Sequence, residues 1–477
     1  MNEILDDKHE NEPSSQNFRD RFVLLLVVLI AFIALIGIAQ RAQVSDTEGP
    51  AISEVALQGD IAMKLFYAYE RWMSLTPANT KNLQEAQKRS AVTWYERAVQ
   101  KDPSPANIRR LIIAQHPSER QKAIRLMETK QMQEAAIWRE IYISNANLSP
   151  KQVEKYSAKI RSIKLGWYEH LALADLYNRA GRAADAQKQH TEAVRTASRT
   201  MGWLVGLLLT LGMLGLVGVA LIIWYATTGR MRPVSALAEP RLEGKRFTSA
   251  YLLEIFLVYL VFWIVTQVAV ALVVVWISPE VGISPFVAII STAGAYILGG
   301  VLATGYLLWR LNRTGWTLEK IGLSTKNPVK DIIWGIGGYA AALPLVIIAG
   351  LLSQVIGKYI PTPPNPVIPL FMESETLFTR LILLGLVAVA APFFEELFFR
   401  GVLFESFRAR WGVNAGIILS ALAFALVHPL PLGLLPIFAL GSVFAVLAYQ
   451  RGSLLPAMVA HGINNTVAFV MLLILME

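Results

Sequence analysis

Nine long apolar runs constrain the fold of this 477-residue chain more than any other feature of its sequence. An α-helix rises about 1.5 Å per residue, so about 20 apolar residues can cross the roughly 30 Å hydrocarbon core of a bilayer. The runs are Phe22–Ala39, Trp203–Ala226, Tyr251–Trp276, Pro285–Trp309, Ile332–Ile356, Leu381–Phe404, Val413–His428, Leu432–Tyr449 and Leu454–Met476. Charged residues make up only 17% of the chain, compared with about 25% in soluble proteins. We therefore predict an all-α multispan membrane protein with about nine transmembrane helices.

Three of these runs need a further comment. The first, flanked by Arg19, Arg21 and Arg41, is longer than the usual apolar region of a cleaved signal peptide, so we interpret residues 22–41 as an uncleaved signal anchor. The run that ends at His428 is short, and residues 428–432 between it and the next run could form a broken or re-entrant element.

The distribution of Lys and Arg predicts the orientation of these spans. Residues 1–21 and the alternate connections that follow contain sixteen Lys and Arg, whereas the short connections on the other side contain only Lys358 and Arg380. Short cytoplasmic loops carry such an excess of basic residues. We expect residues 1–21 to be a cytoplasmic tail, the C-terminus to lie outside, and the protein to reside in a bacterial-type cell (inner) membrane.

Residues 42–200 have the composition of a soluble helical domain, which this orientation places on the extracytoplasmic side. The segment contains 24 basic and 17 acidic residues, and thus most of the net charge of +9. Two stretches resemble tetratricopeptide spacing: Ala91, Tyr95, Ala98 and Pro103 in the first, and Leu173, Ala174, Tyr177, Gly181, Ala186 and Ala193 in the second. The period is not sustained between them, so an unrelated helical bundle fits nearly as well.

The placement of charge and the absence of cysteine exclude several function classes. With basic residues in cytoplasmic loops and in this domain, the net charge does not indicate nucleic-acid binding. The chain has no cysteine, which excludes disulfides, thiolate zinc sites, iron–sulfur clusters and a cysteine nucleophile.

Ionisable side chains cluster in the late apolar runs, where insertion of each costs about 2.5–3.5 kcal/mol. Glu395, Glu396 and Arg400 occur in one run, Phe424 and His428 in the next, and His461 and Asn465 in the last. Glu396 and Arg400 are four residues apart, so they can form an ion pair on one helix face. Glu395 is rotated by about 100° from its neighbour Glu396 around the helix, so it is left without that partner and is free to act as a general acid or base. Helix stabilisation, a helix-end hydrogen bond of His428 and interhelical bonding by His461 and Asn465 are the structural alternatives.

The order Glu395-Glu396-x-x-x-Arg400, Phe424-x-x-x-His428 and His461-x-x-x-Asn465 resembles the CAAX protease and bacteriocin-processing family of intramembrane endopeptidases. This family includes the type II CAAX prenyl proteases. The resemblance covers roughly residues 250–477 and implies a bundle of eight helices, a number that the second to ninth runs would supply. It implies nothing about residues 1–200.

The resemblance also implies a role for each motif residue. Glu395 would act with His428 to activate a water, His461 and Asn465 would stabilise the oxyanion, and Glu396 with Arg400 would hold Glu395. Phe424 would support the site by packing. No cofactor is expected; zinc is conceivable with one Glu and two His ligands, but Asn465 is a poor zinc ligand and a good oxyanion donor.

Other functions are compatible with the same residues. A proton-coupled transporter would use buried Glu and His, although the polar motifs show no repeat between halves. A catalytically silent scaffold or immunity protein would use residues 42–200 to bind protein partners. We divide the chain into 1–21, 22–41, 42–200, 201–249 (second span and basic loop) and 250–477 (protease-like domain). We expect a substrate that is a membrane-anchored or membrane-proximal peptide, and we see no reason to assume prenylation.

Overall fold

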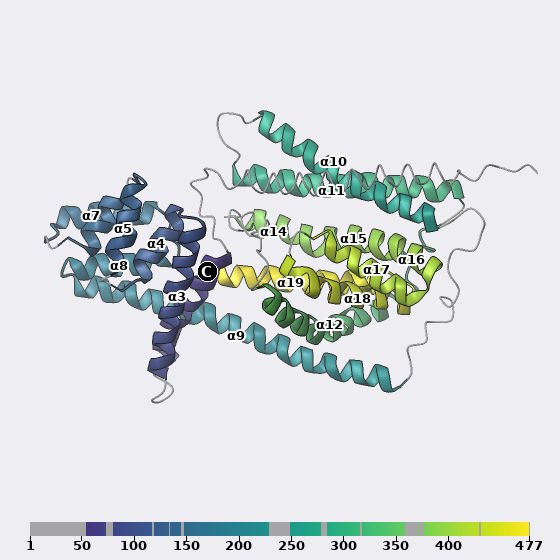
Figure 1. Ribbon diagram of the computed structural model, residues 1–477, viewed down its shortest axis with the longest axis horizontal. Coiled ribbons are helices and arrows are strands. Elements are labelled where there is room, and N and C mark those ends of the chain that lie inside the picture. Colours follow the sequence, from purple (N-terminus) through teal and green to yellow (C-terminus); the bar gives the residue numbers. More distant parts are fainter. Residues whose placement is uncertain are drawn as a thin grey trace, which may run out of the picture. The chain divides into compact units, whose positions relative to one another are not determined.

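The computed structural model describes residues 54–72, 80–116, 119–132, 134–144, 147–228, 249–277, 284–314, 317–357, 371, 376–428 and 431–476. In these residues the regular structure is helical throughout, with no strands, as predicted. The predicted tail 1–21 and signal anchor 22–41 lie outside the described residues. The described residues form two compact units, drawn in Figure 1. The helical unit comprises those up to 213 together with 371 and 467–476, and the membrane unit comprises those from 214 to 466 apart from 371.

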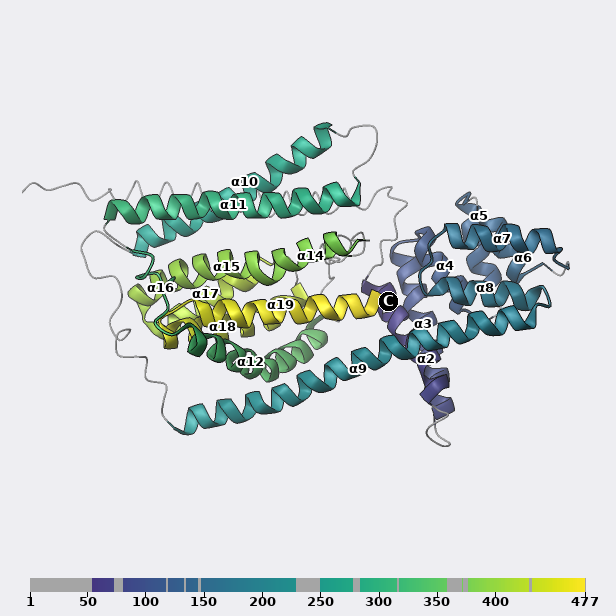
Figure 2. The same ribbon diagram turned by 180° about the vertical axis from the view of Figure 1, so that it is seen from behind.

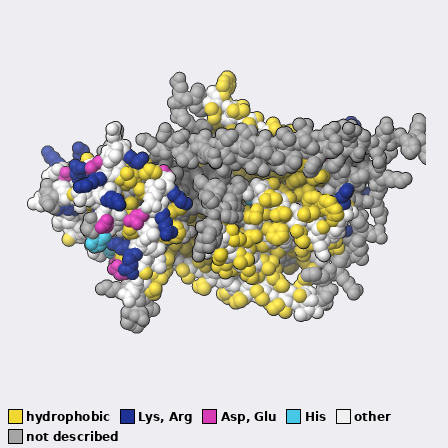
Figure 3. All heavy atoms as spheres, viewed as in Figure 1, with side chains coloured by type: hydrophobic (Ala, Val, Ile, Leu, Met, Phe, Trp, Pro, Cys, Tyr) yellow, Lys and Arg dark blue, Asp and Glu magenta, His cyan; other side chains and the backbone are white. Residues whose placement is uncertain are grey.

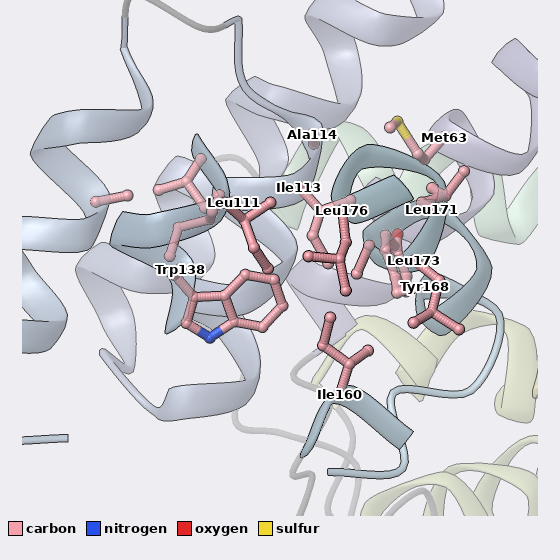
Figure 4. Packing of buried hydrophobic residues seen from close by; sticks show 14 of the residues in the cluster. Met63, Leu111, Ile113, Ala114, Trp138, Ile160, Tyr168, Leu171, Leu173 and Leu176 are labelled. Carbon is pink, nitrogen blue, oxygen red and sulfur yellow. The ribbon is translucent and has the colours of Figure 1, made fainter. Parts of the chain in front are cut away.

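Seven short or medium helices precede the first described span and build most of the helical unit. They are α2 (Glu54–Trp72), α3 (Thr80–Lys101), α4 (Pro105–Ala114), α5 (Arg120–Thr129), α6 (Ala135–Tyr142), α7 (Pro150–Ser162) and α8 (Tyr168–Arg179). Local sequence explains several ends: α4 and α7 each begin with a proline, and Ser149 and Gln152 form a capping box at α7. Consecutive helices pack against one another around an apolar core that includes Leu111, Trp138 and Leu176 (Figure 4).

Most of the residues with tetratricopeptide spacing lie in this core. Ala91, Tyr95 and Ala98 of α3 are fully buried. The second stretch forms the predicted helix–turn–helix, with Gly181 at φ +71° in the turn after α8, a conformation that favours glycine. Antiparallel helix pairs of this kind fit a tetratricopeptide-like domain and other helical bundles alike, so that assignment stays a prediction.

A buried polar network joins four helices of the helical unit around Asp60. Its Oδ1 atom accepts hydrogen bonds from the hydroxyls of Tyr95 and Tyr168, both at 2.8 Å, and from Arg110 Nε at 3.1 Å. Burial, with the nearby negative charge of Asp60 as the next cause, raises the pKa of both tyrosine hydroxyls well above the ordinary value. The hydroxyls therefore stay protonated and donate to the carboxylate.

One helix, α9 (Ala183–Thr227), continues from the helical unit into the membrane unit without a break. The expected boundary between residues 200 and 201 therefore falls inside a helix. Apolar side chains in its second half are exposed, for example Met213 at 70% and Leu216 at 72%. Such exposure is the pattern of a surface that faces lipid.

Long apolar helices build the membrane unit (Figure 2). After α9 come α10 (Ser249–Ile277), α11 (Pro285–Thr314), α12 (Pro328–Gly357), the composite helix 377–411, α17 (Val413–Leu426), α18 (Leu434–Arg451) and α19 (Leu455–Met476). The helices approach closely at glycines: a Cβ at Gly218 of α9 would lie 1.9 Å from Ala340 O of α12. Figure 3 shows hydrophobic side chains over most of the coloured surface of this unit, and charged ones mainly on the helical unit.

Seven of the described helices are long and apolar enough to cross a membrane, and this identifies an integral membrane protein. These seven correspond to predicted runs two to six, eight and nine. The seventh run forms only the 14-residue helix α17, shorter than a full crossing, and the first lies outside the described residues. The predicted count of nine is therefore unconfirmed.

Candidate functional site

The helix that carries the two glutamates is a composite of α and π segments. It runs through α14 (Leu377–Gly385), η3 (Leu386–Ala390), α15 (Ala391–Glu396), η4 (Leu397–Leu403) and α16 (Phe404–Trp411), with η3 and η4 π-helical. Pro392 explains the first π segment, because it has no N–H to donate to the preceding turn. In π geometry Ala391 N–H bonds Leu386 O, and the next carbonyl, of Val387, would need Pro392 as its donor. π segments occur often at functional sites.

Helix α19 supplies the hydrogen-bond donor that Pro392 cannot give to the Val387 carbonyl. Asn465 Nδ2 donates to Val387 O at 2.7 Å, so the expected oxyanion donor uses one of its two N–H groups to satisfy the carbonyl. One turn earlier, a Cβ at Gly462 would lie 2.6 Å from Ala388 O. Only glycine allows α19 to approach this closely, and the approach places His461 beside the glutamates.

Glu396, Arg400 and His461 form a buried polar cluster. The predicted ion pair between Glu396 and Arg400 is present, with Oε1 to Nη1 at 2.9 Å and both side chains fully buried. The same Oε1 lies 2.8 Å from His461 Nδ1. Because an ionised carboxylate only accepts, Nδ1 carries the proton in this contact. Arg400 Nη2 also donates to Gly441 O at 3.1 Å.

Aromatic rings enclose this cluster. The Arg400 guanidinium lies 4.3 Å from the centroid of Phe424, and the Phe444 ring stacks on His461 at 5.0 Å. A cation over a ring face in a desolvated position is stabilised by the ring quadrupole. Phe424 therefore contacts the cluster through its ring.

Glu395 lies at the edge of the cluster, with its side chain 16% exposed. Tyr296 of α11 donates to Glu395 Oε1 at 2.8 Å. The other oxygen, Oε2, is 3.7 Å from His461 Nε2 and has no hydrogen-bond partner among the described residues. One carboxylate oxygen is thus held while the other faces the imidazole.

The second histidine lies at a helix end. His428 follows the last residue of α17 by two positions, and its Nδ1 lies 2.7 Å from Phe424 O, the carbonyl four residues earlier. In the described part of the chain, no hydrogen bond or ion pair joins His428 to Glu395. The bond to Phe424 O is the helix-end hydrogen bond that was the structural alternative for His428.

Two pairings differ from those implied by the family resemblance. Glu396 contacts His461 rather than Glu395, and Glu395 faces His461 rather than His428. The four ionisable groups are two carboxylates, one guanidinium and the His461 imidazole. With a neutral imidazole the cluster carries one net negative charge, so one further proton, shared between Glu395 and His461, would make it neutral. Such a set can accept and return one proton in a reaction.

The described residues contain no group of three His, Asp or Glu that could hold a metal ion. The Arg400 guanidinium already neutralises Glu396, where a cation would bind. The cluster therefore does not fit a zinc site.

Sequence reasoning missed three contributors to the site: Tyr296, Phe444 and Gly462. Tyr296 is 99 residues from Glu395 and carries no motif. Gly462, directly after His461, was the available signal, since a glycine inside an apolar span often marks close helix packing.

The fold and the site define an integral membrane protein with a buried acid, base and guanidinium cluster among its late helices. Residues 377–467 match the family of Rce1-like type II CAAX prenyl endopeptidases and form a domain of that family. The matched segment contains every predicted site residue from Glu395 to Asn465, and it is shorter than the range 250–477 that the motifs indicated. No curated protein and no solved structure matches the chain.

Proposed function

We propose that this protein is an intramembrane endopeptidase that hydrolyses a peptide bond of a membrane-anchored or membrane-proximal protein. The observation that carries the proposal is the pair of Glu395 Oε2 and His461 Nε2, 3.7 Å apart within the family-matched segment. Membership of that domain in a protease family favours a peptide substrate.

The proposed reaction begins with a water between Glu395 and the scissile carbonyl. Glu395 takes one proton from the water as the oxygen bonds the carbonyl carbon, and it later returns that proton to the leaving amine. The negative charge passes to the carbonyl oxygen. His461, protonated at Nε2, donates to this oxyanion, and Glu396 stabilises the imidazolium through Nδ1.

Asn465 and His428 have narrower proposed roles. The second N–H of the Asn465 amide would donate to the oxyanion, while the first holds the Val387 carbonyl. His428 would assist Glu395 in holding the water through Nε2, since its Nδ1 bonds Phe424 O. Arg400 holds the Glu396 carboxylate in place through their ion pair. No step requires a metal, so treatment with a chelator should leave activity unchanged; loss of activity that zinc restores would contradict this.

We further propose that residues 42–200 form an extracytoplasmic domain that recruits or gates a protein partner of the protease. The charge distribution of the loops supports a cytoplasmic N-terminus and a bacterial-type cell membrane. Deleting residues 50–195 should change the processing of at least one native substrate. If the processing of all native substrates is unchanged, this role is wrong.

The test of the protease compares membrane proteomes of cells that carry the wild-type or the Glu395→Gln protein. An uncleaved membrane protein should accumulate with Glu395→Gln, and its cleavage by purified protein in liposomes should fall about 10²–10⁴-fold. Glu254→Gln is the matched control, because Glu254 is also a membrane glutamate but pairs with Arg310 at 2.9 Å. Equal turnover by wild-type and Glu395→Gln proteins would refute the proposal.

A further inference from the structure

Tyr296 lies outside the family-matched segment, and its hydroxyl bonds the proposed catalytic glutamate. We infer that Tyr296 is a positioning residue that selects Glu395 Oε2 as the oxygen that takes the proton. The inference rests on the proposed function of Glu395. Its structural part, the control of the Glu395 carboxylate by Tyr296, can be measured without turnover.

The argument starts from the two oxygens of Glu395. Without a fixed donor, a carboxylate can rotate and present either oxygen. The Tyr296 hydroxyl donates to Oε1 at 2.8 Å, whereas Oε2 has no hydrogen-bond partner in the described residues. Since a bonded oxygen is a weaker acceptor for a further proton, Oε2 is the oxygen free to act.

The ring of Tyr296 is itself held in place. Trp263 of α10 contacts it edge to face, with centroids 6.2 Å apart, and Phe394 lies at 6.5 Å. A hydroxyl on a ring confined by two aromatic neighbours keeps one direction, as a positioning group requires. The donor comes from α11, so the geometry of the base depends on a helix that carries no motif residue.

The charged and titratable groups near Glu395 come from each element packed around it. They are Tyr296 of α11, Tyr259 of α10, Glu396 of its own helix, Arg400 of η4 and His461 of α19. Tyr296 is the one among them that donates a hydrogen bond to Glu395. Removing this donor should therefore leave the carboxylate free to rotate, so that neither oxygen is fixed toward the reaction.

The test records the Glu395 carboxyl band by infrared difference spectroscopy on full-length protein in liposomes. The band is assigned by its absence from Glu395→Gln. In Tyr296→Phe this band should shift in frequency, because Oε1 loses the hydrogen bond that the Tyr296 hydroxyl donates. With a substrate found as above, kcat should fall about tenfold with little change in KM.

Tyr306→Phe is the matched control, because Tyr306 is on the same helix and donates to another glutamate, Glu254, at 3.1 Å. It should leave the Glu395 band unchanged. An unchanged Glu395 band in Tyr296→Phe, or an equal shift in both variants, overturns the inference. If Glu395→Gln keeps full turnover while Tyr296→Phe shifts the band, the proposed function fails and the contact between the two residues stands.

Discussion

Both units bury an acidic group beside an arginine, but they satisfy it differently. In the helical unit, Asp60 accepts hydrogen bonds from two tyrosines and Arg110, and both of its oxygens are engaged. In the membrane unit, Glu395 Oε2, Glu396 Oε2 and Arg400 Nε have no partner in the described part of the chain. Most buried polar atoms in folded proteins have a hydrogen-bond partner, so each of these three atoms requires an explanation.

We propose that this difference separates a structural network from a functional one. A fully satisfied network stabilises a unique packing. A network with open acceptors costs stability, and it is retained where those acceptors take part in a reaction. The following predictions test this distinction.

The largest effect on stability is expected from Arg400→Met. The substitution leaves Glu396 as a buried charge without its partner, which costs about 3–5 kcal/mol. Unfolding of the purified protein in mixed detergent micelles measures this loss. The double variant Glu396→Gln with Arg400→Met should recover part of it, and equal stability of wild-type and Arg400→Met proteins would contradict the role of the pair.

Asp60→Ala should destabilise the helical unit by about 2–4 kcal/mol, because it leaves Arg110 and two tyrosine hydroxyls without their acceptor. Hydrogen–deuterium exchange should quicken in α2, α3 and α8. Peptides of α15 should not change. Faster exchange confined to α15 would mean that this network does not serve the helical unit.

Asn465→Ala removes the donor to Val387 O and should cost about 1–2 kcal/mol. The π segment η3 should exchange its amides faster as a result. Asn464→Ala is the control, since Asn464 is adjacent and its side chain donates to the Asn465 side chain at 3.3 Å rather than to the Val387 carbonyl. Equal effects of the two variants would argue against the role of Asn465 at the Pro392 interruption.

The smallest effect on stability is expected from Glu395→Gln, less than about 1 kcal/mol, because the Tyr296 hydroxyl can still donate to the amide oxygen. Turnover should nevertheless be lost. A stable but inactive variant is the signature of a functional acid, and a loss of stability comparable to that of Arg400→Met would place Glu395 with the structural residues.

Much of the architecture was predictable because it depends on local rules. Apolar length located the described spans, and the spacing of four residues predicted the Glu396–Arg400 pair. The short α17 shows the limit of that approach: composition extended the run to His428, but the helix ends at Leu426 before Pro429, as residues preceding a proline disfavour helical geometry.

Sequence by itself determined that the chain enters a membrane, that its apolar runs are helical, and that Glu396 and Arg400 pair on one helix face. Only the tertiary structure decided the partners: Tyr296 for Glu395, Glu396 for His461, and the Val387 carbonyl for Asn465. The physical reason is that spacing along one helix sets contacts within that helix. Contacts between helices depend on how closely the backbones approach. Here Gly462 allows the close approach of α19, and the missing N–H of Pro392 leaves the Val387 carbonyl available to Asn465.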